Sequence, residues 1–294
     1  MSRLARRNVL KDLARPLVHR VRGNGTGAAP TPDNSPEAAE FEQVVHDVGY
    51  WYHSIPVGHG VVTPGVNPLS GYQAEAEHLL PLSGKTVIDI GAYDGFYSFF
   101  AEEHGALRVV ALDHFVWSLD LPRHIEYWED CKRRGIAPEP YEDTDAWDPA
   151  HLPGKRGFDT AHRLRNSHVE AVVGDFMTMD LEPLGTFDVA LFLGILYHLE
   201  DPMRALRRLA SVTGEVAYVE TAGIDVPWYR NDSIVEFYEA GELNDDVSNW
   251  WAPNERALIG MCRAAGFRRV EPIVSGRKRL LVGGRNRLFV RAWK

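Results

Sequence analysis

The chain has 294 residues, with 32 Lys and Arg against 41 Asp and Glu, and a formal net charge of −9. Its 45% hydrophobic and 25% charged content is typical of a folded globular protein and excludes a disordered or fibrous chain. Only Cys131 and Cys262 are present, in no metal-ligand spacing, which argues against a zinc site and a disulfide framework and indicates a reducing, cytoplasmic environment. No apolar stretch approaches the length of a membrane span, and the N-terminus lacks the features of a signal peptide.

The charge is unevenly distributed along the chain. Residues 1–22 carry seven basic side chains and one acid, and Leu10, Leu13 and Leu17 recur there at helical spacing. We expect a basic N-terminal helix, either solvated or in contact with RNA, an anionic membrane or a partner protein. Residues 23–40 are rich in Gly, Pro and Ala and predict a flexible linker, so the working domain spans 41–294, with 41–80 as an N-terminal lid.

Apolar runs of strand length alternate with stretches of helical periodicity through this domain. The strands are expected at 87–90, 109–112, 170–173, 189–192 and 216–219, and helices at 203–210 and 255–265. This alternation predicts an α/β fold with a mostly parallel sheet covered on both faces. Residues 270–274 and 288–293 add a closing antiparallel hairpin, which makes seven strands. Two aromatic-rich stretches, 114–166 and 222–254, are too long for simple crossovers and predict insertions that act as lids or binding loops.

A glycine-containing loop follows the first of the parallel strands. Asp89 ends that strand, and Gly91, Tyr93 and Gly95 lead into a segment of helical pattern. Such a turn lets a ligand approach the backbone at the start of a helix. The loop lacks the three glycines of a dinucleotide fingerprint, and Asp113 closes the next strand, where a carboxylate can hold ribose hydroxyls. We therefore expect a ligand with a nucleoside but no diphosphate.

The order of these residues resembles the class I S-adenosylmethionine-dependent methyltransferases, which have a Rossmann-like fold. Asp89, Gly91, Gly95 and Asp113 match the family's acid and glycine positions, while Tyr93 stands where the middle glycine belongs. The resemblance implies S-adenosylmethionine as the cofactor. It further implies that Asp175 accepts from the adenine amino group and Phe176 stacks on the adenine ring, and it adds His114 and Gly194 to the cofactor-binding set.

A closer resemblance involves the segment 187–199, followed by Asp201 and Pro202. It is similar to the fourth-strand segment of the bacterial tRNA wobble-uridine 5-oxyacetate synthases and their shorter relatives, and the similarity extends to 51–55, 62–65, 242–244 and 249–254. The resemblance implies that Tyr197 helps to hold the cofactor. Those tRNA enzymes use a carboxylated cofactor and neutralise it with an N-terminal lysine and a C-terminal arginine. Residues 41–80 contain no Lys or Arg, and the arginine has no certain counterpart among Arg277, Lys278 and Arg279, so ordinary S-adenosylmethionine is expected.

The candidate catalytic residues are His198, Tyr197 and Glu220. His198 follows the fourth strand at its carboxyl end and has the reference pKa of a general base, although it could instead cap the next helix. Glu220, which ends the fifth strand, could orient an acceptor group or serve a structural role.

Aromatic and amide side chains supply the candidate acceptor site. Tyr52 and His53 are lid residues, and Trp250, Trp251 and Asn254 form an aromatic wall for a planar or apolar acceptor, with core packing as the alternative for each of them. No arrangement of His, Asp and Glu has metal-ligand spacing, and we expect no metal.

Three functions remain open at this point. The first is a methyltransferase that acts on a small-molecule acceptor. The second is a tRNA wobble-base alkyltransferase, which the charge disfavours, because residues 23–294 carry −15 and nucleic-acid binding requires a basic surface. The third is a cofactor-binding protein without catalysis, suggested by Tyr93 in the glycine loop. The acceptor atom and the oligomeric state are not determined by the sequence.

Overall fold

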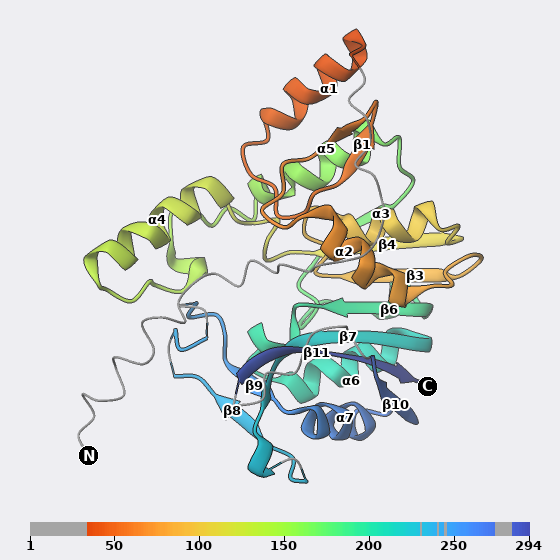
Figure 1. The fold of residues 1–294 in the computed structure, drawn as a ribbon, viewed down its shortest axis with the longest axis vertical. Helices are drawn as coiled ribbons and strands as arrows, with labels where there is room; N and C mark the ends of the chain where they lie inside the picture. Colours follow the sequence, from red (N-terminus) through yellow and green to blue (C-terminus); the bar gives the residue numbers. More distant parts are fainter. Residues whose placement is uncertain (1–33, 230, 240, 244–245, 274–283) are drawn as a thin grey trace.

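The computed structural model describes residues 34–229, 231–239, 241–243, 246–273 and 284–294. A seven-stranded sheet with the order β10-β11-β7-β6-β3-β4-β5 runs through the molecule (Figure 1). The five parallel strands are β3 (Thr86–Ile90), β4 (Arg108–Asp113), β5 (Glu170–Val173), β6 (Phe187–Leu193) and β7 (Thr213–Asp225). The antiparallel pair consists of β10 (Arg269–Pro272) and β11 (Gly284–Trp293), and β11 also runs antiparallel to β7. The predicted fold class is confirmed.

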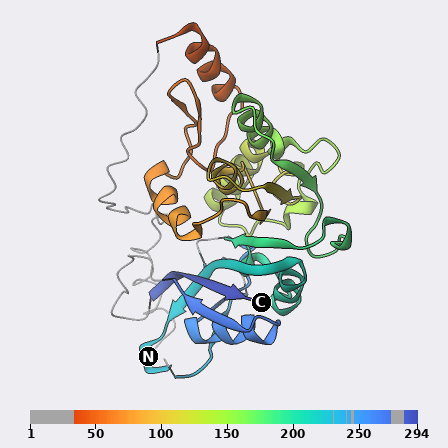
Figure 2. The same ribbon diagram turned by 90° about the vertical axis from the view of Figure 1, so that its right-hand side faces the viewer.

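Seven α-helices and two small hairpins surround this sheet in the described part of the chain. The helices are α1 (Pro36–His46), α2 (Leu69–Ala76), α3 (Phe96–Glu103), α4 (Leu121–Arg134), α5 (Arg156–Leu164), α6 (Pro202–Val212) and α7 (Glu255–Ala264). The hairpins pair β1 (Pro56–Gly58) with β2 (Val61–Val62) and β8 (Val235–Phe237) with β9 (Trp251–Pro253). Figure 2 shows α1 at one end of the molecule.

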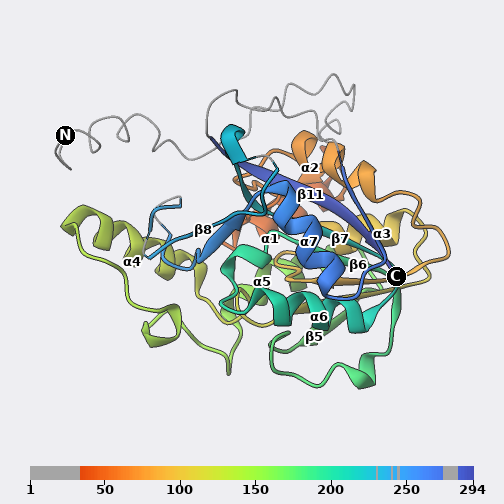
Figure 3. The ribbon, with the colours of Figure 1, turned by 90° about the horizontal axis from the view of Figure 1, so that it is seen from below.

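Alternate residues of the parallel strands feed two separate hydrophobic cores. Ile88 and Ala190 belong to the core that contains α6 and α7 side chains such as Leu206 and Leu258. Val87 and Val189 belong to the other core, with side chains of α3 and α5 such as Phe99 and Phe158. Figure 3 shows α6 and α7 together on their face of the sheet. Burial of both faces explains why these strands read as continuous apolar runs in the sequence.

The prediction of a flexible linker over 23–40 is wrong for its last residues, because α1 begins at Pro36. The Ser35 side chain caps this helix by accepting from the Ala38 N–H at 3.1 Å, and Pro36 provides the preset backbone angle of a first helical position. Ala38 and Val45 are then buried against the domain. The expectations for residues 1–22 and for 23–33 lie outside the described residues.

Both predicted insertions contain helices or strands over part of their length. The stretch 114–166 holds α4, which Asp120 caps and Gly135 ends, and also α5, whose Phe158 and Ala161 lie in the core. Strand β7 continues to Asp225, inside the predicted insertion 222–254, because β11 pairs with it as far as Gly284. Helix α4 and the β8–β9 hairpin lie on the side toward which the parallel strands point (Figure 1). No helix among the described residues is long and apolar enough to cross a membrane.

Candidate functional site

Four strands bring predicted site residues to one edge of the sheet. Ile90 of β3 lies opposite Leu112 of β4 and Phe192 of β6, and Leu193 lies opposite Glu220 of β7. The residues that follow on these strands are therefore neighbours at the carboxyl edge, where open α/β sheets bind their ligands. They are Gly91, Asp113 and Gly194, and they lie beside Glu220. The prediction that Glu220 ends its strand is wrong, because β7 continues to Asp225. The Gly91 N–H donates to Leu112 O at 2.7 Å and the Gly194 N–H donates to Glu220 O at 3.0 Å, which fixes the edge.

The loop after β3 requires left-handed backbone at three places. The φ angles are 72° at Gly91, 55° at Tyr93 and 90° at Gly95. A Cβ on Gly91 would lie 2.7 Å from the Ile195 side chain, and one on Gly95 would lie 2.5 Å from the Phe99 ring. Both positions therefore require glycine, because of their positive φ angles and because a side chain would clash.

Tyr93 is held in this unfavourable conformation by two hydrogen bonds. Its N–H donates to Asp113 Oδ2 at 2.9 Å, and its carbonyl accepts from the indole N–H of buried Trp117 at 2.6 Å. A left-handed residue that is not glycine costs about 1 kcal/mol, which contacts of this kind offset. The loop therefore keeps the shape of a glycine loop although tyrosine occupies the middle position.

The two acids of the motif have different surroundings. Asp113 accepts backbone N–H groups from Tyr93 and, at 3.2 Å, from Val116, and burial raises the pKa of its carboxyl to about 6. Asp89 accepts the Ser98 hydroxyl at 2.6 Å, and burial raises its pKa to about 6 as well. Ser98 belongs to α3, so Asp89 braces the start of that helix, while Asp113 stands at the sheet edge.

A third acid, Asp94, ties the N-terminal segment onto the glycine loop. Its Oδ2 accepts the backbone N–H groups of Tyr52 at 3.0 Å and His53 at 2.7 Å. Its Oδ1 forms a hydrogen bond with Nδ1 of His53. We call these three hydrogen bonds the Asp94 clamp. His53 is 5% exposed and Asp94 is 3% exposed, so the clamp is closed to solvent.

Aromatic rings extend the clamp into a cover over the loop. The Tyr52 ring stacks on Tyr93 with centroids 4.8 Å apart, and the His53 ring stacks on Phe96 at 5.4 Å. Tyr72, from α2, meets the His53 ring edge to face at 4.6 Å. The expected lid residues therefore lie directly against the loop that follows β3.

Tyrosine hydroxyls gather around Glu220 at the same edge. Burial raises the pKa of Tyr72, and the nearby Tyr52 hydroxyl and Glu220 carboxylate raise it further. The pKa of Tyr197 is also raised by burial, and the charges of Tyr52 and Glu220 act in the same direction while Arg287 opposes them. The phenols of Tyr72, from α2, and Tyr197, from the segment after β6, thus lie near the Glu220 carboxylate, and Tyr52 of the lid lies near both of them.

Glu220 is neutralised by a residue of the last strand. Arg287 of β11 forms a two-pronged ion pair with both carboxylate oxygens of Glu220. The Arg287 guanidinium also lies over the Tyr197 ring, 4.9 Å from its centroid. Because the two charges cancel, this pair supplies polar atoms to the edge without adding net charge.

His198 lies next to Tyr197 in a separate hydrogen-bonded group. It ends the 3-10 helix Leu196–His198, and its ring centroid lies 4.1 Å from that of Tyr197. Its Nδ1 is 2.8 Å from the Ser248 hydroxyl. Burial lowers the pKa of His198 below its usual 6.5, so the ring is neutral at pH 7.

The residues expected to contact adenine have partners of their own. Asp175 accepts the Met177 N–H at 2.8 Å and the Thr178 hydroxyl at 2.7 Å, which closes the turn after β5. Phe176 is 8% exposed and packs against Phe192. The His114 ring meets Trp147 at 5.6 Å. These side chains follow β4 and β5 as predicted, and their contacts with adenine stay a prediction.

The predicted aromatic wall gains no support from two of its three members. Trp251 is 4% exposed because β9 inserts it into the core, where its indole N–H donates to Leu199 O at 2.9 Å. Asn254 caps α7 through the Ala257 N–H at 2.9 Å. Trp250 is half-buried beside Phe237, at 6.5 Å. Core packing, the alternative considered for these residues, describes Trp251, whereas the capping role of Asn254 was not predicted.

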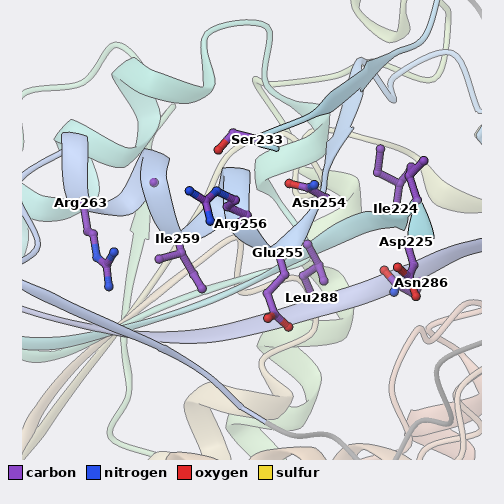
Figure 4. Close-up of a pocket in the computed structure, with 12 residues that line it drawn as sticks. Ile224, Asp225, Ser233, Asn254, Glu255, Arg256, Ile259, Arg263, Asn286 and Leu288 are labelled. Atoms are coloured by element: carbon purple, nitrogen blue, oxygen red, sulfur yellow. The ribbon is translucent and has the colours of Figure 1, made fainter. Parts of the chain in front are cut away.

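Asn254 instead borders a cavity on another side of the sheet. This cavity of about 600 Å³ lies between α7 and the ends of β7 and β11. Figure 4 shows Arg256 and Arg263 of α7 on it, with Asp225 and Asn286 from the strands. None of its lining residues belongs to the glycine loop or to the edge at Asp113. Within the described part of the chain, no group of three or more His, Cys, Asp or Glu side chains is arranged to hold a metal.

Sequence analysis did not identify Asp94, Tyr72 or Arg287 as site residues. Asp94 stands between Tyr93 and Gly95, and an acid inside such a loop is a usable signal for a clamp. Tyr72 and Arg287 carry no local signal, because their contacts join segments that are far apart in the chain. Arg287 ends a stretch with several basic residues, 277–287, and such a stretch by itself indicates only a charged surface.

A family model described as "Methyltransferase domain" matches residues 69–271. Among curated proteins, the chain is similar to tRNA U34 carboxymethyltransferases. It is 24% identical over 204 residues to that of Alteromonas mediterranea, covering 67% of this chain and 49% of the relative. It is 25% identical over 193 residues to that of Shewanella baltica, covering 65% and 46%. The chain thus spans about half the length of the curated relatives it matches.

Solved structures share the fold. The N-terminal domain of EvdMO1 with SAH bound superposes with a TM-score of 0.56 at 16% identity, covering 87% of this chain and 96% of that domain. The same domain in the presence of SAH and D-fucose gives 0.54 at 15% identity over 87% of this chain and 96% of that domain. The phospholethanolamine N-methyltransferase 2 of Haemonchus contortus gives 0.52 at 13%, covering 78% and 54%. Since the family model matches more than half of the residues, the chain belongs to the methyltransferase-domain family, with the fold of the class I S-adenosylmethionine-dependent methyltransferases.

Proposed function

We propose that this protein transfers a methyl group from S-adenosylmethionine to a hydroxyl group of a small, uncharged acceptor. The observation that carries the proposal is the set of polar groups at the carboxyl edge of the sheet. The Tyr72 and Tyr197 hydroxyls lie near the Glu220–Arg287 pair, whose charges cancel, with Tyr52 close to both tyrosines, and neutral His198 stands beside Tyr197. Such a site offers hydrogen bonds and aromatic faces without a net charge for a charged acceptor to pair with.

The residues at this edge fit the cofactor. Gly91 and Gly194 present backbone without side chains, and Asp113 holds its carboxylate in a fixed orientation between two N–H donors. With a pKa of about 6, Asp113 is ionised at neutral pH and can accept from two ribose hydroxyls. Gly91, Tyr93, Gly95, Asp113 and Gly194 are thus the residues that would hold the cofactor. When bound, S-adenosylmethionine supplies a methyl group on a positively charged sulfur, which leaves with the electron pair of the C–S bond.

The remaining task of the protein is to position the acceptor and to remove its proton. Tyr52, Tyr72 and Tyr197 would orient the acceptor, since alignment alone contributes several kcal/mol to a displacement reaction. His198 would accept the hydroxyl proton as general base, because it is neutral at pH 7 and lies on the segment after β6. The EvdMO1 domain, a protein of this fold, has a crystal structure determined in the presence of SAH and D-fucose, a hydroxylated small molecule.

A second function is favoured by the curated relatives, which are tRNA U34 carboxymethyltransferases. Against it stand the low identity and the −15 charge of residues 23–294. Arg287 lies at this edge but is paired with Glu220, so its charge is already neutralised and does not favour the carboxylated cofactor of those relatives.

The test combines cofactor binding with an acceptor search. Calorimetry with S-adenosylmethionine and SAH should show binding of both. Transfer of a labelled methyl group should then be measured on a panel of neutral glycosides and phenols, on carboxylated analogues of them, and on unmodified tRNA. Transfer to a neutral hydroxyl, reduced at least tenfold in His198→Gln, supports the proposal. Transfer to tRNA, or to the carboxylated analogues in preference, would replace it.

A further inference from the structure

A chain of hydrogen bonds leads from His198 into both insertions. Nδ1 of His198 lies 2.8 Å from Oγ of Ser248, and the Ser248 hydroxyl donates to Asp246 Oδ1 at 2.7 Å. The Tyr141 hydroxyl donates to the same carboxylate oxygen at 2.8 Å. Ser248 and Asp246 lie between β8 and β9, whereas Tyr141 begins the 3-10 helix Tyr141–Asp143 after α4. This series of hydrogen bonds therefore joins residues 141, 198 and 248, which are far apart in the sequence.

The proton positions in this chain follow from what each atom can donate. An ionised carboxylate only accepts, so the proton between Ser248 and Asp246 must belong to the serine. A serine hydroxyl has a single proton, and Ser248 therefore offers His198 only a lone pair. Oγ accordingly accepts a hydrogen from Nδ1 of the histidine.

A second atom requires the same assignment. The backbone carbonyl of Ser248 lies 3.3 Å from Nδ1 of His198, and a carbonyl oxygen cannot donate. Both neighbours of Nδ1 are thus acceptors, and the proton of the neutral ring sits on Nδ1. The other nitrogen, Nε2, then carries the basic lone pair.

We propose that Ser248 and Asp246 are positioning residues that hold His198 in its Nδ1-protonated form, so that Nε2 is the atom that takes the proton of the acceptor. This inference rests on the proposed function, in which His198 is the base. The acceptor O–H bond breaks, its proton goes to Nε2, and its electron pair remains on oxygen for the new bond to the methyl carbon. The proton leaves Nε2 to solvent afterwards, which restores the neutral ring.

The same series of hydrogen bonds stabilises the His198 ring after it has taken the proton. Nδ1 keeps its hydrogen bond to Ser248, and the Asp246 carboxylate lies behind it. The groups that act on His198 oppose one another. Burial lowers its pKa, the Asp246 charge and the Ser248 backbone raise it, and Arg287 lowers it again. Removal of the Asp246 charge should therefore lower the pKa of His198 further.

The direct test reads the tautomer by NMR, without cofactor or acceptor. The full chain is labelled with ¹⁵N-histidine, and two-bond ¹H–¹⁵N correlation spectra are recorded across the pH range. The signals of His198 are assigned by their loss in His198→Gln, since the chain has 12 histidines. We expect the Nδ1–H form in the natural protein. In Ser248→Ala the shorter contact is lost and only the longer one, to the backbone carbonyl at 3.3 Å, remains, so a measurable fraction of the Nε2–H form should appear. Ser248→Thr, which keeps the hydroxyl, should restore the Nδ1–H form.

Two further variants separate positioning from general loss of structure. Asp246→Asn keeps an acceptor oxygen for Ser248, so the tautomer should persist while the pKa of His198 falls. Ser211→Ala is the matched control, because its hydroxyl donates only to Arg208 O within α6. It should leave the His198 signals unchanged, and thermal unfolding of every variant verifies the fold.

The outcomes distinguish this inference from the proposed function. An Nε2–H tautomer in the natural protein, or an unchanged tautomer in folded Ser248→Ala, overturns the positioning role and leaves the methyltransferase proposal standing. Full turnover in His198→Gln removes His198 as the base whatever its tautomer. If both roles hold, the acid limb of the kcat/KM profile moves to lower pH in Asp246→Asn, in parallel with the pKa measured by NMR.

Discussion

At the scale of single residues, the two buried acids of the glycine-loop motif have the same pKa but different neighbours. Asp89 and Asp113 are 2% and 5% exposed, and burial raises the pKa of each carboxyl from 3.8 to about 6. Asp89 is bound to Ser98 of α3, whereas Asp113 orients its carboxylate with backbone donors at the sheet edge. The two acids can therefore be separated experimentally by replacing each with its neutral isostere.

Asp113→Asn should weaken cofactor binding and change the pH dependence of the protein's stability. A folded-state pKa above the unfolded value means that folding disfavours the ionised form, so this cost is absent below pH 3.8, grows as pH rises and is complete above about pH 6. Asn removes this pH-dependent cost, which amounts to about 3 kcal/mol if the whole shift is realised, but its amide nitrogen must face one of the two backbone N–H donors and loses that hydrogen bond. Measured by urea unfolding, the stability of Asp113→Asn relative to the natural protein should therefore be higher at pH 8 than near pH 4, while calorimetry should show at least tenfold weaker S-adenosylmethionine binding.

Asp89→Asn is the comparison that gives this result its meaning. It should show the same pH-dependent gain in stability, with a smaller loss of cofactor affinity, because its carboxylate faces Ser98. Equal losses of affinity in the two variants would assign the ribose contact to neither acid alone. Undiminished affinity in a folded Asp113→Asn would remove Asp113 from the cofactor site.

At the scale of elements, the sequence predicts best what local pattern controls. The alternation that places Ile88 in one core and Val87 in the other makes each parallel strand recognisable. The sequence leaves Trp251 open between an acceptor wall and the core, because aromatic residues in an insertion fit either, and strand pairing of β9 with β8 places it in the core. Arg287 finds Glu220 only through the register of β11 on β7, which no local pattern specifies.

The segment that covers the glycine loop should depend on Asp94. Three hydrogen bonds from Tyr52 and His53 end on its carboxylate, two of them from backbone N–H groups. Asp94→Ala leaves these buried donors unpaired and should destabilise the protein by about 2–3 kcal/mol. Hydrogen exchange, followed by mass spectrometry, should rise sharply over residues 50–55.

A matched acid on the surface provides the control for this prediction. Asp159 of α5 pairs with Lys155 and its side chain is 58% exposed, so Asp159→Ala should change stability by less than about 1 kcal/mol. Exchange over 50–55 should then stay at the natural level. If Asp94→Ala also leaves that exchange unchanged, the aromatic contacts hold the segment without the clamp.

At the scale of the whole molecule, α1 sets where the chain can be shortened. The helix begins at Pro36 behind the Ser35 cap, and it packs Ala38 and Val45 against the domain. Removal of residues 1–33 keeps the cap and should leave both stability and methyl transfer unchanged. Removal of residues 1–40 deletes the cap and the first turn, and it should cost about 1 kcal/mol or more.

Thermal unfolding of the two shortened chains beside the full chain measures this difference. Equal stability of all three would show that α1 contributes nothing through its first turn. Loss of methyl transfer with retained stability in the chain that starts at residue 34 would give the removed residues 1–33 a part in the reaction.

The hydrogen bond between Tyr141 and Asp246 has a consequence for engineering new acceptor specificity. It joins one insertion to the other, and Asp246 is in turn attached to His198 through Ser248. Grafting the stretch 114–166 from a related enzyme would remove Tyr141, one of the donors to Asp246. Grafting 222–254 would remove Asp246 and Ser248 themselves. Chimeras should therefore exchange both stretches from the same donor enzyme, as one module.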